Sequence, residues 1–141
     1  MLPRRECLCY QLRMDPRAFD ELVERALAKV PKRFRTRMRN VAIVVESEPS
    51  KRQLRGSPQS TLLGLYEGRP LTVRSVSDSF VLPDRITIFQ GPHERLARSP
   101  DHLQELVDDT VWHEVAHYFG MDEARVRSAE RRRRVVKRRR T

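Results

Sequence analysis

The chain has 141 residues, of which 38% are hydrophobic and 34% charged, and its formal net charge is +10. This length supports one domain with a hydrophobic core but not two independently stable domains, and the composition excludes a largely disordered chain. No apolar run approaches the about 18 residues of a membrane-spanning helix, and residues 1–10 lack the apolar stretch of a signal peptide, so we expect a cytoplasmic protein.

The positive charge is concentrated at the C-terminus. Residues 125–141 hold ten Lys and Arg side chains and one acid, Glu130, so this segment carries +9 and the rest of the chain +1. We expect a lead-in over residues 1–13, one folded domain over residues 14–128 and a basic tail over residues 129–141. Such a run is typical of a solvated, partly helical tail, and it also allows weak, salt-sensitive contact with nucleic acid or another anionic surface.

The first predicted element is a helix that begins at Asp15-Pro16, because Asp favours the capping position and Pro the first turn. Apolar residues then recur at spacings of three and four and form one stripe: Phe19, Leu22, Val23, Ala26, Leu27 and Val30. Pro31 ends the pattern, so we expect this helix to contribute one face to the core.

Strands are predicted in the middle of the chain. Residues 41–45 are an apolar, β-branched run typical of a buried strand, and residues 62–67, 71–73 and 86–89 are further candidates. Between the first two, residues 47–60 are polar and include two Pro and one Gly, which predicts a mobile loop.

A second long helix is predicted from about residue 100 to residue 119. Its periodic apolar positions are Leu103, Leu106, Val107, Thr110, Val111 and Val115. Gly120 is expected to end it, and a short helix is expected from Ala124. The order of elements predicts a single-domain α+β fold, with a small mixed sheet, an N-terminal helix and this late helix.

The late helix carries the sequence His113-Glu114-Val115-Ala116-His117. Residues four apart lie on the same face of a helix, so the two imidazoles can bind one metal ion. Glu114 can then reach a water on that ion and accept its proton. This His-Glu-x-x-His pattern is typical of zinc hydrolases, in which the metal lowers the pKa of the water.

A third ligand is expected after Gly120, where a left-handed turn would let the chain fold back. Glu123, six residues after His117, is the preferred candidate, and the adjacent Asp122 is the alternative. Two His and one carboxylate leave a fourth position for water, which is the geometry of a catalytic zinc site.

The string from His113 to Glu123 resembles the elongated zinc motif of metzincins, with Glu in place of the last His. More closely, the segment 110–123 is similar to small bacterial zincin-like metallopeptidases, the minimal zincins. The similarity extends upstream to Asp15-Pro16 with Phe19, to the segment 64–70 and to the segment 82–86. It implies a compact α+β zincin core over roughly residues 14–126, one zinc ion per chain, and a peptide or protein substrate. Nothing after Glu123 could form the methionine turn of a true metzincin.

Other side chains are candidates for supporting roles. Asp109, four residues before His113, could orient its imidazole. Three side chains could stabilise a developing oxyanion beside the metal: Tyr66, Arg74 and Arg85. His93 and His102 have no partner at ligand spacing and are expected to be exposed or capping residues.

The sequence therefore predicts a zinc-dependent metallohydrolase, a peptidase by its resemblance, with Glu114 as the general base and His113, His117 and Glu123 as zinc ligands. The alternative is a nucleic-acid-associated or ribosome-associated protein that acts through its Arg-rich tail and whose zinc site is structural or vestigial. A non-peptide substrate and the oligomeric state are left open.

Overall fold

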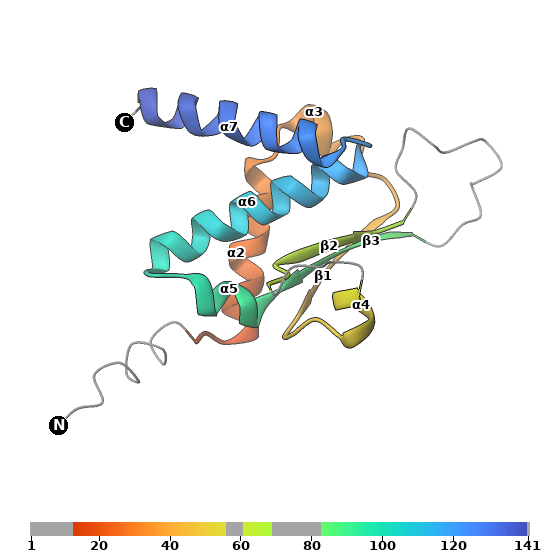
Figure 1. The fold of residues 1–141 in the computed structure, drawn as a ribbon, viewed down its shortest axis with the longest axis vertical. Coiled ribbons are helices and arrows are strands. Elements are labelled where there is room, and N and C mark those ends of the chain that lie inside the picture. Colours follow the sequence, from red (N-terminus) through yellow and green to blue (C-terminus); the bar gives the residue numbers. More distant parts are fainter. Residues whose placement is uncertain (1–12, 56–60, 69–82, 141) are drawn as a thin grey trace.

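A computed structural model describes residues 13–55, 61–68 and 83–140. The predicted strand at residues 71–73 and nearly all of the lead-in lie outside these ranges. In chain order the elements are α2 (Pro16–Lys29), α3 (Lys32–Arg35), β1 (Val41–Glu46), α4 (Lys51–Arg55), β2 (Gly64–Glu67), β3 (Asp84–Phe89), α5 (Gln90–Leu96), α6 (Pro100–Tyr118) and α7 (Glu123–Arg140) (Figure 1).

The N-terminal helix α2 is built as its sequence predicts. The Asp15 carboxylate accepts a hydrogen bond from the backbone N–H of Arg17 at 2.9 Å, and Pro16 occupies the first turn. The helix ends at Lys29, before Pro31. Its buried residues are Phe19, Leu22, Val23 and Ala26, four members of the predicted apolar stripe.

The three strands form a mixed sheet in the order β1-β3-β2, in which β3 is parallel to β1 and antiparallel to β2. Ile86 and Ile88 lie on the same face of β3 because successive side chains alternate across a strand. Both are fully buried in one cluster with apolar residues of α2 and α6. The two helices therefore cover the same face of the sheet, and the α+β fold class expected from the sequence is confirmed.

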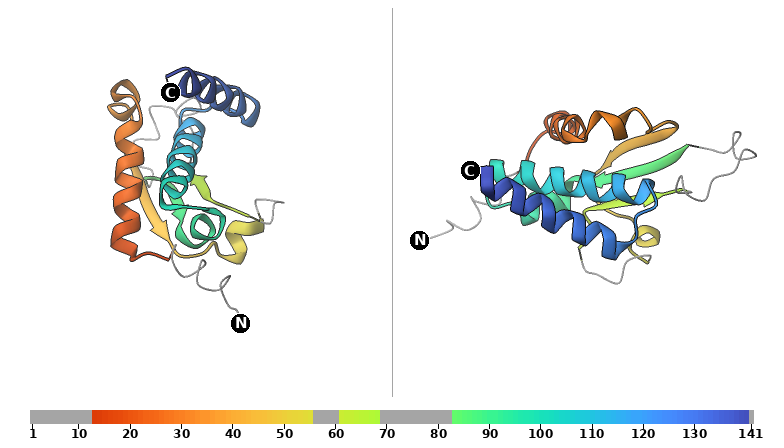
Figure 2. Two further views of the ribbon diagram at one scale, coloured as in Figure 1. Left: turned by 90° about the vertical axis from the view of Figure 1, so that its left-hand side faces the viewer. Right: turned by 90° about the horizontal axis from the view of Figure 1, so that it is seen from above.

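Helix α6 lies at the centre of the molecule and contacts α2, α5, α7, β2 and β3 (Figure 2). The Ser99 hydroxyl caps it by accepting from the N–H of His102 at 3.0 Å. Asp108 on α6 forms an ion pair of 2.5 Å with Lys29 of α2. Helix α6 is therefore held against both the sheet and α2.

Gly64, the first residue of β2, allows this strand to lie directly against α6. A Cβ atom at this position would be 2.6 Å from Thr110 Cγ2 and 3.1 Å from Glu114 Cγ. Thr110 is buried and β-branched, so it has little freedom to move away. Because Gly64 has no side chain, β2 can lie close beside Glu114.

The prediction of a mobile loop over residues 47–60 is wrong in part, because residues 51–55 form α4. Ser50 and Gln53 cap this helix reciprocally: the Ser50 hydroxyl accepts from the Gln53 N–H at 3.2 Å, and the Gln53 side chain accepts from the Ser50 N–H at 2.7 Å. Residues 56–60 are outside the described ranges. The short helices α3 and α5 were not predicted either.

The prediction that His93 is an exposed or capping residue is also wrong, because its side chain, on α5, is fully buried. Nδ1 lies 2.6 Å from the carbonyl oxygen of Phe89, and Nε2 lies 2.8 Å from the Thr110 hydroxyl of α6. Burial lowers the pKa of His93, against the opposing effect of backbone acceptors, so the neutral ring joins α5 to α6.

The helix expected from Ala124 begins at Glu123 and is long rather than short, with 18 residues to Arg140. It runs back alongside α6 (Figures 1 and 2). Among the described residues, no helix is long and apolar enough to cross a membrane.

Candidate metal centre

His113 and His117 lie one turn apart near the C-terminal end of α6. Their ring centroids are 4.8 Å apart, and both side chains are half-buried. The hydrophobic side of the same helix, including Val111 and Val115, is buried in the core. The core packing of α6 therefore fixes the direction of the two imidazoles, as the periodicity of the sequence predicts.

The chain reverses direction immediately after His117. Gly120 has a φ of 82°. Its N–H donates to the His117 carbonyl at 2.9 Å, and the N–H of Met121 donates to the Ala116 carbonyl at 3.1 Å. These two bonds make a Schellman motif, which requires a left-handed residue that Gly supplies without strain. This turn returns the chain to the face of α6 that carries the histidines.

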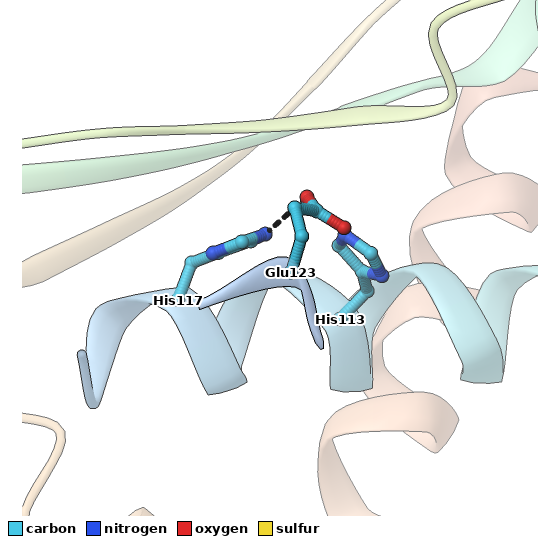
Figure 3. Close-up of side chains that lie close together, drawn as sticks. All are labelled: His113, His117 and Glu123. Carbon is cyan, nitrogen blue, oxygen red and sulfur yellow. Dashed lines mark hydrogen bonds and ion pairs between the residues drawn. The ribbon is translucent and has the colours of Figure 1, made fainter. Parts of the chain in front are cut away.

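The returning chain brings Glu123 between the two imidazoles (Figure 3). Its Oε1 atom lies 3.2 Å from Nε2 of His113 and 3.0 Å from Nε2 of His117. One ligand atom from each of the three residues lies within 4.8 Å of the others. Asp122 has a different contact: its Oδ1 accepts from the N–H of Arg125 at 2.9 Å and caps α7.

The other ring nitrogen of each histidine lies beside an acceptor. Nδ1 of His117 is 3.1 Å from the carbonyl oxygen of Met121, and Nδ1 of His113 is 3.0 Å from Oε1 of Glu130. A carbonyl or carboxylate oxygen only accepts, so these contacts favour a proton on each Nδ1, and a neutral ring in that tautomer presents an unprotonated Nε2. In that tautomer two imine nitrogens and the Glu123 carboxylate, all three hydrogen-bond acceptors, face one another.

A cation among these three acceptors would neutralise the repulsion between them. A proton shared with Glu123 would do so, and so would a metal ion. Zinc with bond lengths of about 2.0–2.1 Å in a tetrahedral site separates its ligand atoms by about 3.3 Å. The observed separations from Glu123 Oε1 are 3.0 and 3.2 Å. Two imidazoles and one carboxylate therefore fit zinc in their chemistry, and the carboxylate oxygen lies at about the expected spacing from both imidazole nitrogens.

Charge around the cluster shifts the pKa values of its members in the sense that favours ion pairing. Burial opposes the ionisation of His113 and of Glu123. The carboxylates of Glu130, Glu114 and Glu123 nevertheless raise the pKa of His113 above its usual value. In turn His113 and His117 lower the pKa of Glu123. The site thus has a negative environment that favours a bound cation.

Glu114 lies beside this cluster and is buried, with 7% of its surface exposed. Burial raises the pKa of its carboxyl group, while the charges of His113 and His117 and a hydrogen bond from the backbone N–H of Tyr66 oppose this rise. Glu114 does not belong to the three-residue cluster. It is a buried carboxylate with raised proton affinity, which is a property of general bases.

The supporting residues suggested by the sequence have other contacts. The Tyr66 hydroxyl donates to Asp84 at 2.5 Å, and Arg85 pairs with Glu46. Arg74 lies outside the described residues.

Asp109 was one candidate for the carboxylate that orients His113, with an exposed position as the alternative, but the carboxylate beside His113 comes from Glu130 on α7. Burial raises the pKa of Asp109, and the nearby Arg133 and Arg134 oppose that shift. Glu130 was missed because no spacing rule joins residues 17 apart on two helices. Its one sequence signal was its position as the single acid in the basic segment.

Comparisons with known proteins find a family and a solved structure to which this chain is similar. The profile of a family described as zincin-like metallopeptidase matches residues 38–133, more than half of the chain. A conserved hypothetical protein from Thermo thermophilus, whose structure is solved, is similar with a TM-score of 0.50 and 26% sequence identity. The match covers 75% of this chain and 94% of that one. No curated protein matches the chain.

Proposed function

Because the chain belongs to the zincin-like metallopeptidase family, we propose that it is a zinc-dependent peptidase. His113, His117 and Glu123 bind one zinc ion per chain, and Glu114 is the general base. The observation that carries this proposal is the convergence of Nε2 of both histidines on Oε1 of Glu123, at 3.2 and 3.0 Å.

The chemistry follows from the groups around this point. A zinc ion, when bound, lowers the pKa of a water molecule toward neutrality and polarises a carbonyl group. Glu114 accepts a proton from the water that attacks the substrate carbonyl and delivers it to the amine nitrogen of the leaving group. The new C–O bond forms first, the C–N bond breaks when the amine leaves with this proton, and Glu114 returns to its ionised state.

The position of β2 supports an extended peptide as the substrate. β2 pairs with β3 on one side, and no other strand of the described ranges pairs with it. Its residue Tyr66 approaches Glu114 through its backbone N–H. A substrate that added to the outer edge of β2 as a further strand would run beside the proposed base.

The first test is cleavage of unfolded protein by the zinc-loaded chain. We expect new peptide termini, detected by mass spectrometry, that disappear with a chelator and return when zinc alone is added back. The apo protein with calcium or magnesium is the matched control, since these ions prefer oxygen ligands. Full zinc occupancy without any new termini across a diverse peptide library would contradict peptidase activity.

We further propose that α7 makes a weak contact with nucleic acid. Its residues 131–139 are all exposed, and seven of the nine are Lys or Arg. At 100° per residue these seven charges surround the helix. The two apolar residues among them, Val135 and Val136, are too few to form the apolar face of a membrane-surface helix. The pattern therefore favours phosphate contacts over insertion into lipid.

The affinity of α7 for nucleic acid should fall steeply with salt. Each arginine that binds a phosphate should, when replaced by alanine, reduce the slope of log K against log[salt] by about 1. The double variant Arg134→Ala with Arg138→Ala should therefore reduce the slope by about 2, measured by fluorescence anisotropy on a labelled DNA or RNA duplex. Arg52→Ala on α4 is the matched control and should leave the slope unchanged. An equal change of slope in both variants, or binding to anionic vesicles alone, would contradict the proposal.

A further inference from the structure

One carboxylate in the basic helix α7 contacts the proposed metal centre. Oε1 of Glu130 lies 3.0 Å from Nδ1 of His113, and both side chains are largely shielded, with 22% and 27% of their surfaces exposed. Glu130 is too far along the chain to be part of the zinc motif. Its contact is with the nitrogen that faces away from Glu123, so it touches the ligand and not the metal position.

We infer that Glu130 is a positioning residue of the metal centre, which holds the His113 proton on Nδ1 and so directs Nε2 toward the ion. This inference rests on the zinc site proposed above.

A parallel within the same site supports this role. His117 has its Nδ1 3.1 Å from the carbonyl oxygen of Met121, so its proton is held by the backbone of the turn. His113 lies one turn earlier on α6, away from that turn, and Glu130 supplies the equivalent acceptor. Metal-binding histidines usually donate their second N–H to a carboxylate or carbonyl, which fixes the tautomer and the ring orientation. Both proposed ligand histidines have such an acceptor: His117 has a carbonyl of the turn, and His113 has a carboxylate of α7.

The inner stripe of α7 explains how Glu130 is held in place. Val126, Glu130 and Arg133 are spaced by four and three residues and therefore lie on one face of the helix. Val126 is fully buried, and the Arg133 guanidinium lies 4.8 Å from the centre of the Trp112 ring of α6. Packing on one side and a cation–π contact on the other thus hold Glu130 against His113.

The charge of the surrounding helix makes this acid distinctive. Residues 125–141 contain ten basic residues and Glu130 alone among acids. A basic residue in its place would bring a positive charge to the imidazole and repel a divalent ion. The first two turns of α7 therefore belong to the metal centre, and the exposed basic part begins after Glu130.

The test compares Glu130→Ala with Glu130→Gln. Alanine removes the acceptor but favours the helix, so α7 should persist. The glutamine carboxamide oxygen can still accept from Nδ1. We expect zinc affinity, measured by competition with a chelating dye, to fall by about 10- to 100-fold in Glu130→Ala. Glu130→Gln should recover most of it. Glu105→Ala, which removes an exposed carboxylate of α6, should retain the wild-type affinity.

A second readout follows the tautomer directly in the metal-free protein. Nitrogen-15 NMR of the His113 ring at alkaline pH should find the proton on Nδ1 in the wild type and in Glu130→Gln, and redistributed toward Nε2 in Glu130→Ala. Equal zinc affinities in Glu130→Ala and Glu130→Gln would mean that Glu130 affects zinc binding through its charge or its packing and not as a hydrogen-bond acceptor. That result would overturn the positioning role. A wild-type protein that binds no zinc would overturn the proposed function, while the tautomer measurement would still decide the role of Glu130.

Discussion

Replacing Glu114 by Gln is expected to leave the zinc content unchanged and to lower the rate of peptide hydrolysis by about 10²- to 10⁴-fold. The carboxamide has nearly the same shape as the carboxylate, and its oxygen can still accept the N–H of Tyr66. It cannot accept a proton, however. Because burial already disfavours the charged carboxylate, the neutral side chain should fold at least as stably.

Three measurements on the same preparation separate the roles of Glu114. Metal analysis reports the ion, the rate of appearance of new peptide termini reports the chemistry, and the melting temperature reports the fold. Glu105→Gln, on the exposed side of the same helix, controls for the loss of one negative charge. Loss of zinc from Glu114→Gln would show that Glu114 is a ligand, and an unchanged rate would show that another group is the base.

Local sequence signals predicted the parts of the molecule that depend on neighbouring residues. The Asp15-Pro16 cap and the apolar stripe specify α2. Local signals also predicted α6 and the turn at Gly120. The φ of 82° at Gly120 is the left-handed conformation that was expected there. The spacing of the two histidines on α6 likewise follows from helix geometry alone.

The helix α4 could have been found from its sequence. Ser50 and Gln53 have the spacing of a capping box, and the structure contains both reciprocal hydrogen bonds. The polar composition and the Pro and Gly residues of the segment favoured a loop instead. A four- or five-residue helix has too little apolar periodicity to oppose those signals.

The contacts that cross between elements could not be predicted from one sequence. His93 is buried because Thr110, 17 residues away, lies against it in the fold. Glu130 is also 17 residues from His113, on a different helix. The length of α7 was missed for a related reason. Arg favours helices, but Val126 is its one fully buried apolar residue, so the pattern contained almost no periodic signal.

Replacing either histidine ligand by alanine is expected to abolish stoichiometric zinc binding. Each of His113→Ala and His117→Ala leaves one imidazole and one carboxylate, which cannot complete a tetrahedral site with a single open position. Zinc that binds the folded chain and not the unfolded one should raise the melting temperature, by more as its free concentration rises above Kd. We expect that stabilisation in the wild type and in neither variant, with metal content measured by mass spectrometry.

The third ligand is the sharper test, because two adjacent acids have different contacts. Glu123 faces both imidazoles, whereas Asp122 caps α7 through the N–H of Arg125. Glu123→Ala should therefore weaken zinc binding by about 10-fold or more, since it removes a carboxylate ligand. Asp122→Ala is the matched control, with the same charge change one residue away. It should cost about 1 kcal/mol of unfolding free energy and leave zinc affinity unchanged. If Asp122→Ala empties the site while Glu123→Ala retains it, the turn at Gly120 delivers the other carboxylate and the ligand assignment is reversed.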